Sequence, residues 1–156
     1  DMSNGGDRCP FCREPIADDE ENTKRNMNRI KANDPDALCH MGTKHDHEGD
    51  YDKAIGYWTK AAELGDVVAH NQLAVVYWNG RGVERDEEKA VYHYEKAAIG
   101  GHPNSRYNLG CVEGSNGNIK RAVKHFIISA NLGHEGSMKM LWKQYSLGNI
   151  TKEDLD

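Results

Sequence analysis

The sequence predicts an all-α protein, a right-handed α/α solenoid of helix–turn–helix units with an N-terminal lead helix. The first observation is an internal repeat: Lys-Ala-x₃-Trp at residues 53–58 returns as Lys-Ala-x₃-Tyr at 89–94 and as Arg-Ala-x₃-Phe at 121–126, 36 and then 32 residues further on. A period of this length is typical of stacked helical pairs that bury their apolar faces against one another. The second observation is composition, because 37% hydrophobic and 29% charged residues suit a thin array with much surface per residue.

The N-terminal part of the chain divides into two predicted segments. Residues 1–17 form a polar leader rich in glycine and proline, without helical periodicity. Residues 18–34 are expected to hold a lead helix that ends near Lys31, followed by a linker. Acidic residues come first, basic residues come last, and Met27 and Ile30 form an apolar pair on one helical face. This helix is expected to cover the end of the solenoid, where repeat arrays need a cap.

Residues 35–148 are predicted to hold three complete repeat units and one partial unit. Each complete unit consists of an A helix, a turn and a B helix, and glycine follows the B helix because it can end a helix in the left-handed region. The units span 35–66, 67–102 and 103–134, with a partial unit at 135–148 and a truncated tail at 149–156. The expected A helices are 36–47, 67–79, 103–113 and 135–147, and the expected B helices are 51–64, 86–99 and 119–132.

Equivalent positions of the repeat predict the core. One apolar residue in each A helix recurs at intervals of 32, 36 and 32 residues and is expected to anchor its helix: Met41, Leu73, Leu109 and Leu141. The residue after it is small in the three complete units, which lets the B helix approach closely. One aromatic residue in each B helix is expected to fill the space between successive units: Trp58, Tyr94 and Phe126.

Two stretches of the repeats carry a family resemblance. They are Ala61-Ala62-Glu63-Leu64-Gly65-Asp66 and, in the next unit, Tyr77-x₂-Gly80-x-Gly82-Val83-x₂-Asp86-x₂-Lys89-Ala90. Both resemble the Sel1-like repeat, a relative of the tetratricopeptide repeat with a longer turn between its helices. The resemblance covers residues 36–148. The first and third units are shortened at that turn, and Trp142 stands in the fourth unit where a small residue belongs.

The Sel1-like resemblance implies a protein-binding scaffold or adaptor that holds a peptide or protein on its concave face, which the A helices line. Carried over by register, that face presents Asn71, Val75, Trp78, Asn104, Tyr107, Cys111, Lys139 and Lys143. An aromatic residue flanked by amides is a suitable anchor set for a peptide, with Trp78 foremost. The alternative for each residue is plain solvent exposure or packing between repeats.

The N-terminal leader carries a second resemblance. Cys9-Pro10-Phe11-Cys12-Arg13 resembles the last Cys-x₂-Cys of a RING finger. In that family the two cysteines are zinc ligands, and the basic residue contacts ubiquitin carried by the partner enzyme. Two thiolates are half a zinc site, so Cys9 and Cys12 imply zinc in a longer parent protein and no cofactor in this fragment.

If the remnant of a RING finger is genuine, the full-length parent would resemble a ubiquitin ligase whose solenoid recruits the substrate. A zinc knuckle completed by another chain and a chance Cys-x₂-Cys are the alternatives. The chain begins at Asp1 rather than Met, which favours a fragment or a processed product.

No catalytic arrangement is predicted in this chain. His93 and His125 share one B-helix position, and His102 and His134 share one position between repeats, which indicates duplication rather than catalysis. A hydrolase of the bacterial, cysteine-rich Sel1-like kind is a third alternative. It is disfavoured because such proteins pair cysteines within each repeat, whereas each of these units holds one cysteine or none.

Charge and cysteine usage limit the partners and the compartment. The formal net charge of −5 argues against nucleic acid or an anionic membrane as partner, because both favour basic surfaces. No apolar run approaches the roughly 20 residues that span a bilayer. Cys39 and Cys111 lie at helical positions far apart in the sequence, which favours the cytoplasm or nucleus over secretion. A missing last B helix leaves Trp142 and Leu147 short of cover, so the sequence also predicts homo-oligomers through the C-terminal end.

Overall fold

The computed structural model describes residues 19–154 of the 156-residue chain. Within that range the protein consists of eight α-helices and has no β-strand. They are α1 (Asp19–Lys31), α2 (Pro35–His47), α3 (Tyr51–Glu63), α4 (Val67–Asn79), α5 (Glu87–Ile99), α6 (Pro103–Ser115), α7 (Ile119–Asn131) and α8 (Glu135–Ser146). The all-α solenoid predicted from the sequence is confirmed, and the observed helix ends differ from the predicted ones by no more than about two residues, the usual uncertainty of such boundaries.

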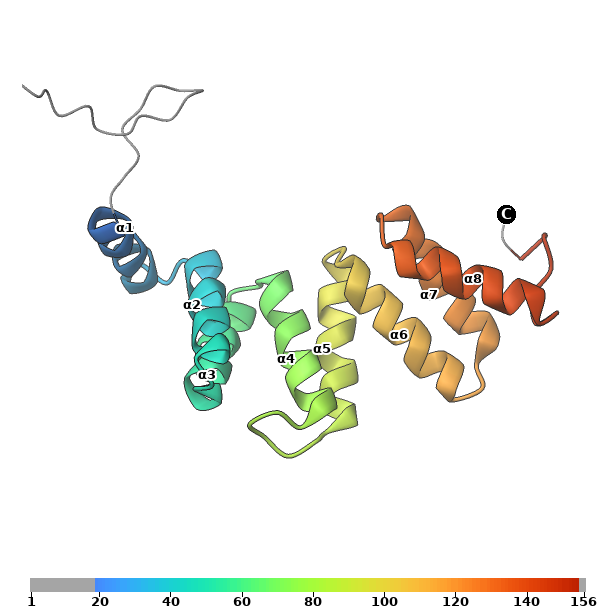
Figure 1. Ribbon diagram of the computed structural model, residues 1–156, viewed down its shortest axis with the longest axis horizontal. Helices are drawn as coiled ribbons and strands as arrows, with labels where there is room; N and C mark the ends of the chain where they lie inside the picture. Colours follow the sequence, from blue (N-terminus) through green and yellow to red (C-terminus); the bar gives the residue numbers. More distant parts are fainter. Residues whose placement is uncertain (1–18, 155–156) are drawn as a thin grey trace, which may run out of the picture.

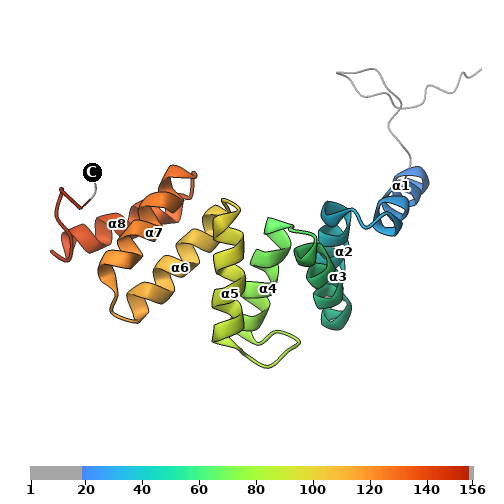
Figure 2. The same ribbon diagram turned by 180° about the vertical axis from the view of Figure 1, so that it is seen from behind.

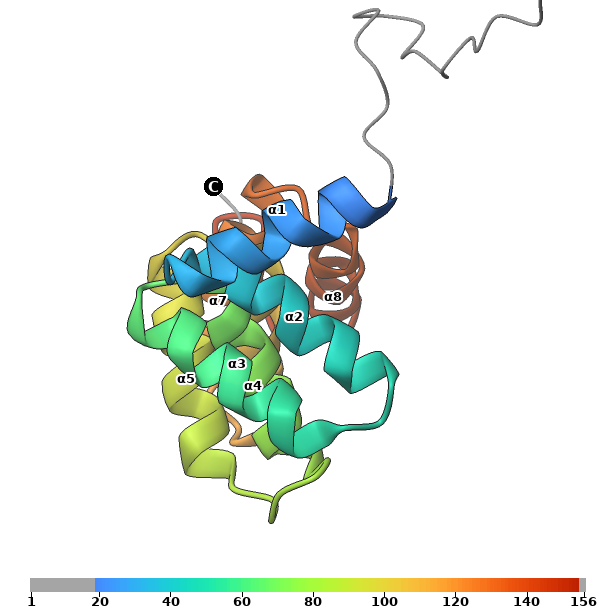
Figure 3. The same ribbon diagram turned by 90° about the vertical axis from the view of Figure 1, so that its left-hand side faces the viewer.

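The helices stack along one long axis, with α1 at one end and α8 at the other (Figure 1, Figure 2). The pairs α2 and α3, α4 and α5, and α6 and α7 pack most extensively, and each pair packs on the next. In the view from the α1 end, α1 lies in front and the later helices follow behind it along the axis (Figure 3). Each unit therefore contacts chiefly its neighbours, as expected for a repeat array in which stability is added unit by unit.

Each A helix of a repeat unit begins at a capping residue that recurs with the period. Asp34 and Asp66 each accept a hydrogen bond from the backbone N–H three residues further on, at 3.2 and 2.6 Å. His102 and His134 take the same position in the later units, and their Nδ1 atoms accept from the equivalent N–H groups at 3.3 and 3.2 Å. Such an acceptor satisfies one of the free N–H groups of the first turn. The two histidines are therefore helix caps, a role that the sequence analysis missed although their alignment with Asp66 carried the signal.

An aromatic ring of the B helix packs on the small residue of the A helix within the same unit. The Trp58 ring lies against Gly42 and the Phe126 ring against Gly110, so closely that a Cβ built on either glycine would lie 2.5 or 2.6 Å from a ring atom. Trp58 also belongs to a buried cluster that reaches Leu73 of α4. The rings thus fill the space within a unit as well as between units, whereas the sequence predicted only the second. The close approach is made by the ring and not by the helix backbone.

The predicted anchors of the A helices are buried with one exception. Leu73, Leu109 and Leu141 are buried, but Met41 is only half-buried. Leu38, one turn earlier, is the fully buried leucine of α2. Met41 instead lines an open groove between α1 and α2. The prediction for Met41 is therefore wrong, because its helix begins the array and its outer side meets a single lead helix instead of a complete unit.

The longer turn of the second unit ties that unit to the first. Arg81 donates a hydrogen bond to Asp46 of α2 at 2.9 Å, and its guanidinium lies 5.6 Å from the centre of the Tyr51 ring. Gly82, at φ 73°, packs so closely on Tyr51 that a Cβ at this position would clash with that side chain. The extra residues of this turn therefore add a polar contact and a packing contact between the first two units.

After α8 the chain turns back toward α7. Ile150 is buried in a cluster with Phe126 and Leu141. Asp154 accepts hydrogen bonds from the backbone N–H and the hydroxyl of Thr151, at 2.8 and 2.9 Å, as the acidic residue of a capping box does. The outer face of α8 stays open, with Trp142 66% exposed, which confirms the predicted lack of cover.

Candidate interaction surfaces

The A-helix residues predicted to bind a partner lie on matching faces of α4, α6 and α8. In α4 the residues Asn71, Val75 and Trp78 are spaced i, i+4 and i+7. In α6 the residues Asn104, Tyr107 and Cys111 are spaced i, i+3 and i+7, and in α8 the residues Lys139 and Lys143 are spaced i and i+4. Residues at these spacings share one side of a helix. Because the three helices follow one another along the array (Figure 1), these residues form a series in register, which we call the A-helix face.

The α4 part of the A-helix face also holds repeats together. The Asn71 side-chain carbonyl accepts a hydrogen bond from the Ser105 hydroxyl of α6 at 2.8 Å. Val75 and Trp78 are half-buried against the core of the second unit. The Arg85 guanidinium lies 5.7 Å from the centre of the Trp78 ring, a cation–π contact that keeps the indole in place. Trp78 is thus a partly exposed aromatic residue whose position is fixed from two sides.

The α6 and α8 parts of the A-helix face are more exposed. Asn104, Lys139 and Lys143 are exposed to solvent. Tyr107 is half-buried, and its ring centre lies 4.5 Å from that of His134 and 5.6 Å from that of Phe126. Tyr107 therefore contributes to packing between the third and fourth units. A role of any of these residues in partner binding stays a prediction.

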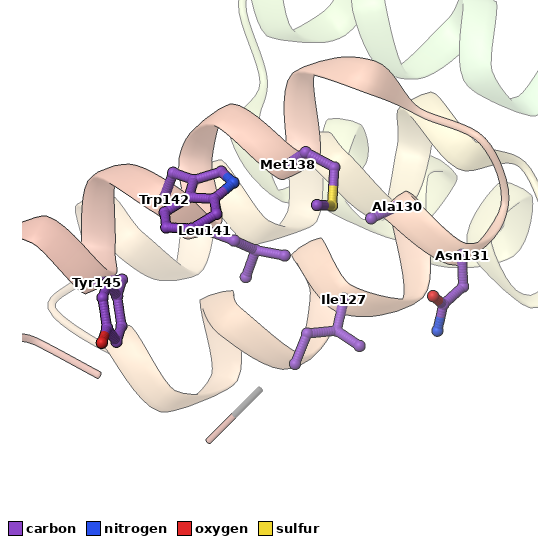
Figure 4. A pocket seen from close by; sticks show the side chains of 7 residues that line it. All are labelled: Ile127, Ala130, Asn131, Met138, Leu141, Trp142 and Tyr145. Atoms are coloured by element: carbon purple, nitrogen blue, oxygen red, sulfur yellow. The ribbon is translucent and has the colours of Figure 1, made fainter. Parts of the chain in front are cut away.

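A separate apolar groove lies between α7 and α8, at the C-terminal end of the array (Figure 4). It has a volume of about 200 Å³ and is lined by Ile127, Ala130, Asn131, Met138, Leu141, Trp142 and Tyr145. We call it the terminal groove. Met138 is 50% exposed in it, although the end of a repeat array is expected to present a polar surface. The sequence predicted the exposure of Trp142 but not the groove, because the groove arises from the packing of two helices.

Two inner grooves of the array occupy the same register as the terminal groove. The first lies between α3 and α4 and is lined by Thr59, Ala62, Glu63, His70, Leu73 and Tyr77. The second lies between α5 and α6 and is lined by Glu95, Ala98, Ile99, Arg106, Leu109 and Glu113. Each of these positions has its equivalent in α7 and α8. Both inner grooves have a third wall, which the B helix of the following unit supplies through His93 of α5 and His125 of α7.

His93 and His125 share a register position but not their partners. His93 Nδ1 lies 3.0 Å from His70 Nδ1, a hydrogen bond in which one neutral ring donates and the other accepts. The same position as His70 holds Arg106 in the next unit, which can only donate. His125 Nδ1 and Arg106 Nε nevertheless both lack a hydrogen-bond partner within residues 19–154. The prediction that both histidines duplicate a structural position agrees with their place in the grooves.

The stability of the protein is expected to fall as the pH drops from about 6.5 toward 4. Burial, together with the neighbouring His70, lowers the pKa of His93 to about 4. The unfolded chain binds protons at an ordinary histidine pKa while folded His93 stays neutral, so acid favours the unfolded state across this window. Allowing for partial exposure, the loss is about 1 kcal/mol of unfolding free energy between pH 7 and pH 5.

Thermal unfolding followed by circular dichroism at pH 7 and pH 5 measures this effect of His93. His93→Gln should reduce the difference in thermal stability between pH 7 and pH 5. His40→Gln, a change at an exposed position of α2, is the matched control and should leave it as in the parent protein. An undiminished difference in His93→Gln would assign the acid sensitivity to other groups.

Residues 19–154 contain no group of three or more His, Cys, Asp or Glu side chains that could hold a metal ion together. Cys39 and Cys111 are free thiols. Burial raises the pKa of the Cys39 thiol to about 12, so this residue packs as a protonated side chain. Cys9 and Cys12 lie outside the described residues, and the RING-like motif stays a prediction. Among α1 to α8, none of the helices is both long and apolar enough to cross a membrane.

The repeat units match a known family model in three consecutive stretches. The Sel1 repeat model matches residues 35–66, 67–102 and 103–134, which is most of the chain. The chain belongs to the Sel1-repeat family. Proteins built from Sel1 repeats are in general protein-interaction scaffolds.

Solved structures of Sel1-repeat proteins resemble this one. A Sel1 repeat protein from Oxalobacter formigenes is 27% identical with a TM-score of 0.76, over 87% of this chain and 59% of that chain. The protein c5321, a protective antigen present in uropathogenic Escherichia coli strains, is 27% identical with a TM-score of 0.72, over 80% of this chain and 28% of its own. Cysteine rich protein B of Helicobacter pylori, at 24% identity and a TM-score of 0.62, shows likeness of fold over 78% of this chain and 93% of that chain.

A curated protein also matches part of the Sel1-repeat chain. Chitin synthase regulatory factor 4 of Schizosaccharomyces pombe is 30% identical over 89 residues, which is 56% of this chain and 14% of that protein. The Sel1-repeat chain thus spans a small part of this relative.

Proposed function

We propose that this Sel1-repeat protein is a scaffold or adaptor that binds a peptide or protein partner on its concave face, through the A-helix face. The observation that carries the proposal is Trp78, a partly exposed indole that Arg85 and the core hold in place. Asn104, Lys139 and Lys143 extend the same face with exposed polar groups. Rigid aromatic anchors surrounded by polar groups are where binding energy concentrates in protein interfaces.

Trp78→Ala is expected to weaken partner binding by about 2 kcal/mol, roughly thirtyfold, as truncation of an interface anchor does. A photo-crosslinking residue at the exposed Asn104 captures the partner from a cell extract, and the affinity of the purified partner is then measured with each variant. Tyr107→Ala should add to the loss. Tyr107→Phe keeps the packing against His134 and Phe126 and separates a binding role from a structural one.

The controls for the A-helix face use other surfaces of the same protein. A photo-crosslinking residue at the exposed Glu95 of α5 should capture no such partner, and Trp142→Ala should bind it as the parent protein does. Circular dichroism of each variant should show unchanged helicity. Full affinity of the folded Trp78→Ala variant would place the binding surface elsewhere.

A second candidate function rests on Cys9, Cys12 and Arg13. In this form of the proposal the A-helix face recruits the substrate of a RING-type ubiquitin ligase, and zinc is bound in the longer parent. The free thiols of Cys39 and Cys111 support a reducing compartment, the cytoplasm or nucleus. Zinc content and ubiquitin transfer of the full-length protein test it, and a parent sequence without further Cys and His pairs upstream removes it.

A further inference from the structure

We propose that the terminal groove is a docking site for an acidic amphipathic helix of a partner protein, placed where the B helix of the fourth unit would lie. The residues that line this site are separate from the A-helix face, although Lys139 and Lys143 of that face lie beside the groove. The terminal groove lies between α7 and α8, on the side of α8 where Met138, Trp142 and Tyr145 are exposed (Figure 4).

The shape of the occupant follows from the two inner grooves. In each, two walls are formed by a B helix and the following A helix, at positions equivalent to those of α7 and α8 in the terminal groove. The third wall is a further helix, α5 in the first inner groove and α7 in the second. In the terminal groove the equivalent third wall is absent among the described residues, and Met138, Trp142 and Tyr145 are exposed as a result. A helix that lies parallel to α7 would bury these side chains as the inner helices bury their equivalents.

The residue that faces Trp142 must be small. Trp142 stands at the register position of Gly42, Ala74 and Gly110, which in the other units leave room for a ring of the B helix. In the fourth unit the large side chain is already on the A helix. Close packing therefore requires alanine or glycine on the docking helix at this point, the reverse of the arrangement inside the array.

The charge of the occupant follows from four lysines around the terminal groove. Lys120 and Lys124 precede Ile127 along one stripe of α7, and Lys139 and Lys143 directly follow Met138 and Trp142 in α8. All four lysines are exposed, and none forms an ion pair within residues 19–154. Residues 103–154 as a whole contain seven lysines and arginines against four aspartates and glutamates, whereas residues 19–66 contain seven against eleven.

An acidic helix fits this surface better than a second copy of the chain. Two copies related by a twofold axis at the groove would present the same lysines to each other, and like charges across an interface are unfavourable. Glutamates flanking an apolar stripe would instead pair with Lys120, Lys124, Lys139 and Lys143.

Binding of synthetic peptides to the 156-residue protein tests the proposal. The probe is a fluorescent helical peptide of about 18 residues, long enough to form a helix, with an alanine and leucine stripe and glutamates on both flanks. The matched peptide has lysines in place of the glutamates. Fluorescence anisotropy should show saturable binding of the glutamate peptide, at least about tenfold tighter than that of the lysine peptide, and weaker binding at high salt.

Variants of the protein locate the peptide in the terminal groove. The double variant Lys120→Glu/Lys124→Glu, which changes no residue of the A-helix face, and the single variant Trp142→Ala should each weaken binding at least about tenfold, the size expected when an interface contact of this kind is lost. Lys60→Glu, an exposed charge reversal on α3, is the matched control and should bind as the parent does. Trp78→Ala should also bind as the parent does, which keeps the outcome separate from that of the A-helix face.

Several results would overturn the proposal. Equal affinity for both peptides, or full affinity of the folded groove variants, would exclude recognition of an acidic helix in this groove. A dimer in sedimentation velocity that Trp142→Ala abolishes would make a second copy the occupant. Binding to vesicles of phosphatidylcholine and phosphatidylserine without peptide binding would identify a membrane contact. Loss of peptide binding in a form of the protein extended beyond Asp156 would show that its own chain fills the groove.

Discussion

Trp58→Ala is expected to lower the free energy of unfolding by about 4 kcal/mol, because a fully buried large aromatic side chain is removed from the core. Trp58 is 1% exposed. Its ring packs on Gly42 and shares a buried cluster with Leu38 and Leu73, so it joins α2, α3 and α4. Its indole N–H also donates to the Cys39 carbonyl at 3.2 Å, a buried hydrogen bond that alanine cannot make.

Urea unfolding followed by circular dichroism measures the effect of Trp58→Ala. Trp142→Ala removes the same side chain from an exposed position of α8 and should change the unfolding free energy by no more than about 0.5 kcal/mol. Trp58→Phe keeps a ring over Gly42 but removes the N–H donor, so its loss of unfolding free energy should lie between those of Trp58→Ala and Trp142→Ala. A Trp58→Ala variant as stable as Trp142→Ala would contradict the packing of α2 on α3.

The period of the sequence was sufficient to predict the helices and most of the core, because each unit solves the same packing problem with equivalent residues. The leucines at positions 73, 109 and 141 are buried where the register placed them. Met41 departs from the pattern because the array begins there, and a register argument treats all units as alike. The capping role of His102 and His134 was missed because histidine is an uncommon cap, although Asp66 at the same position is a common one.

The candidate surfaces were predictable only in part. Helical spacing placed Asn71, Val75 and Trp78 on one face of α4, but it gave no sign that Asn71 bonds to Ser105. The contact of Arg85 with Trp78 depends on the path of the long turn, which local sequence does not determine. The terminal groove was not predicted, because it is formed by side chains of two helices and by a third wall that is absent from residues 19–154.

Gly42→Ala is expected to destabilise the protein by about 2 kcal/mol, although alanine is the better helix former, because the added methyl group overfills a packed site. A Cβ at Gly42 would lie 2.5 Å from Trp58 Cδ1, so the indole or the helix must shift. Gly56 of α3 is the matched control, since it is exposed and has no atom within 4 Å of an added Cβ. Gly56→Ala should therefore stabilise the protein by up to about 1 kcal/mol.

The second unit indicates how the cost of Gly42→Ala arises. That unit has Ala74 where the first has Gly42, and Tyr94 where the first has Trp58, and both side chains are buried. If the clash with the indole causes the loss, Gly42→Ala/Trp58→Tyr should be more stable than the sum of the two single changes predicts, with a coupling of about 1 kcal/mol or more in a double-mutant cycle of urea unfolding. Additive effects would place the strain in the backbone of α2. Coupling would show that the small residue and the ring change together between units, so that the unusual Trp142 of the fourth unit demands a small residue from whatever helix packs against it.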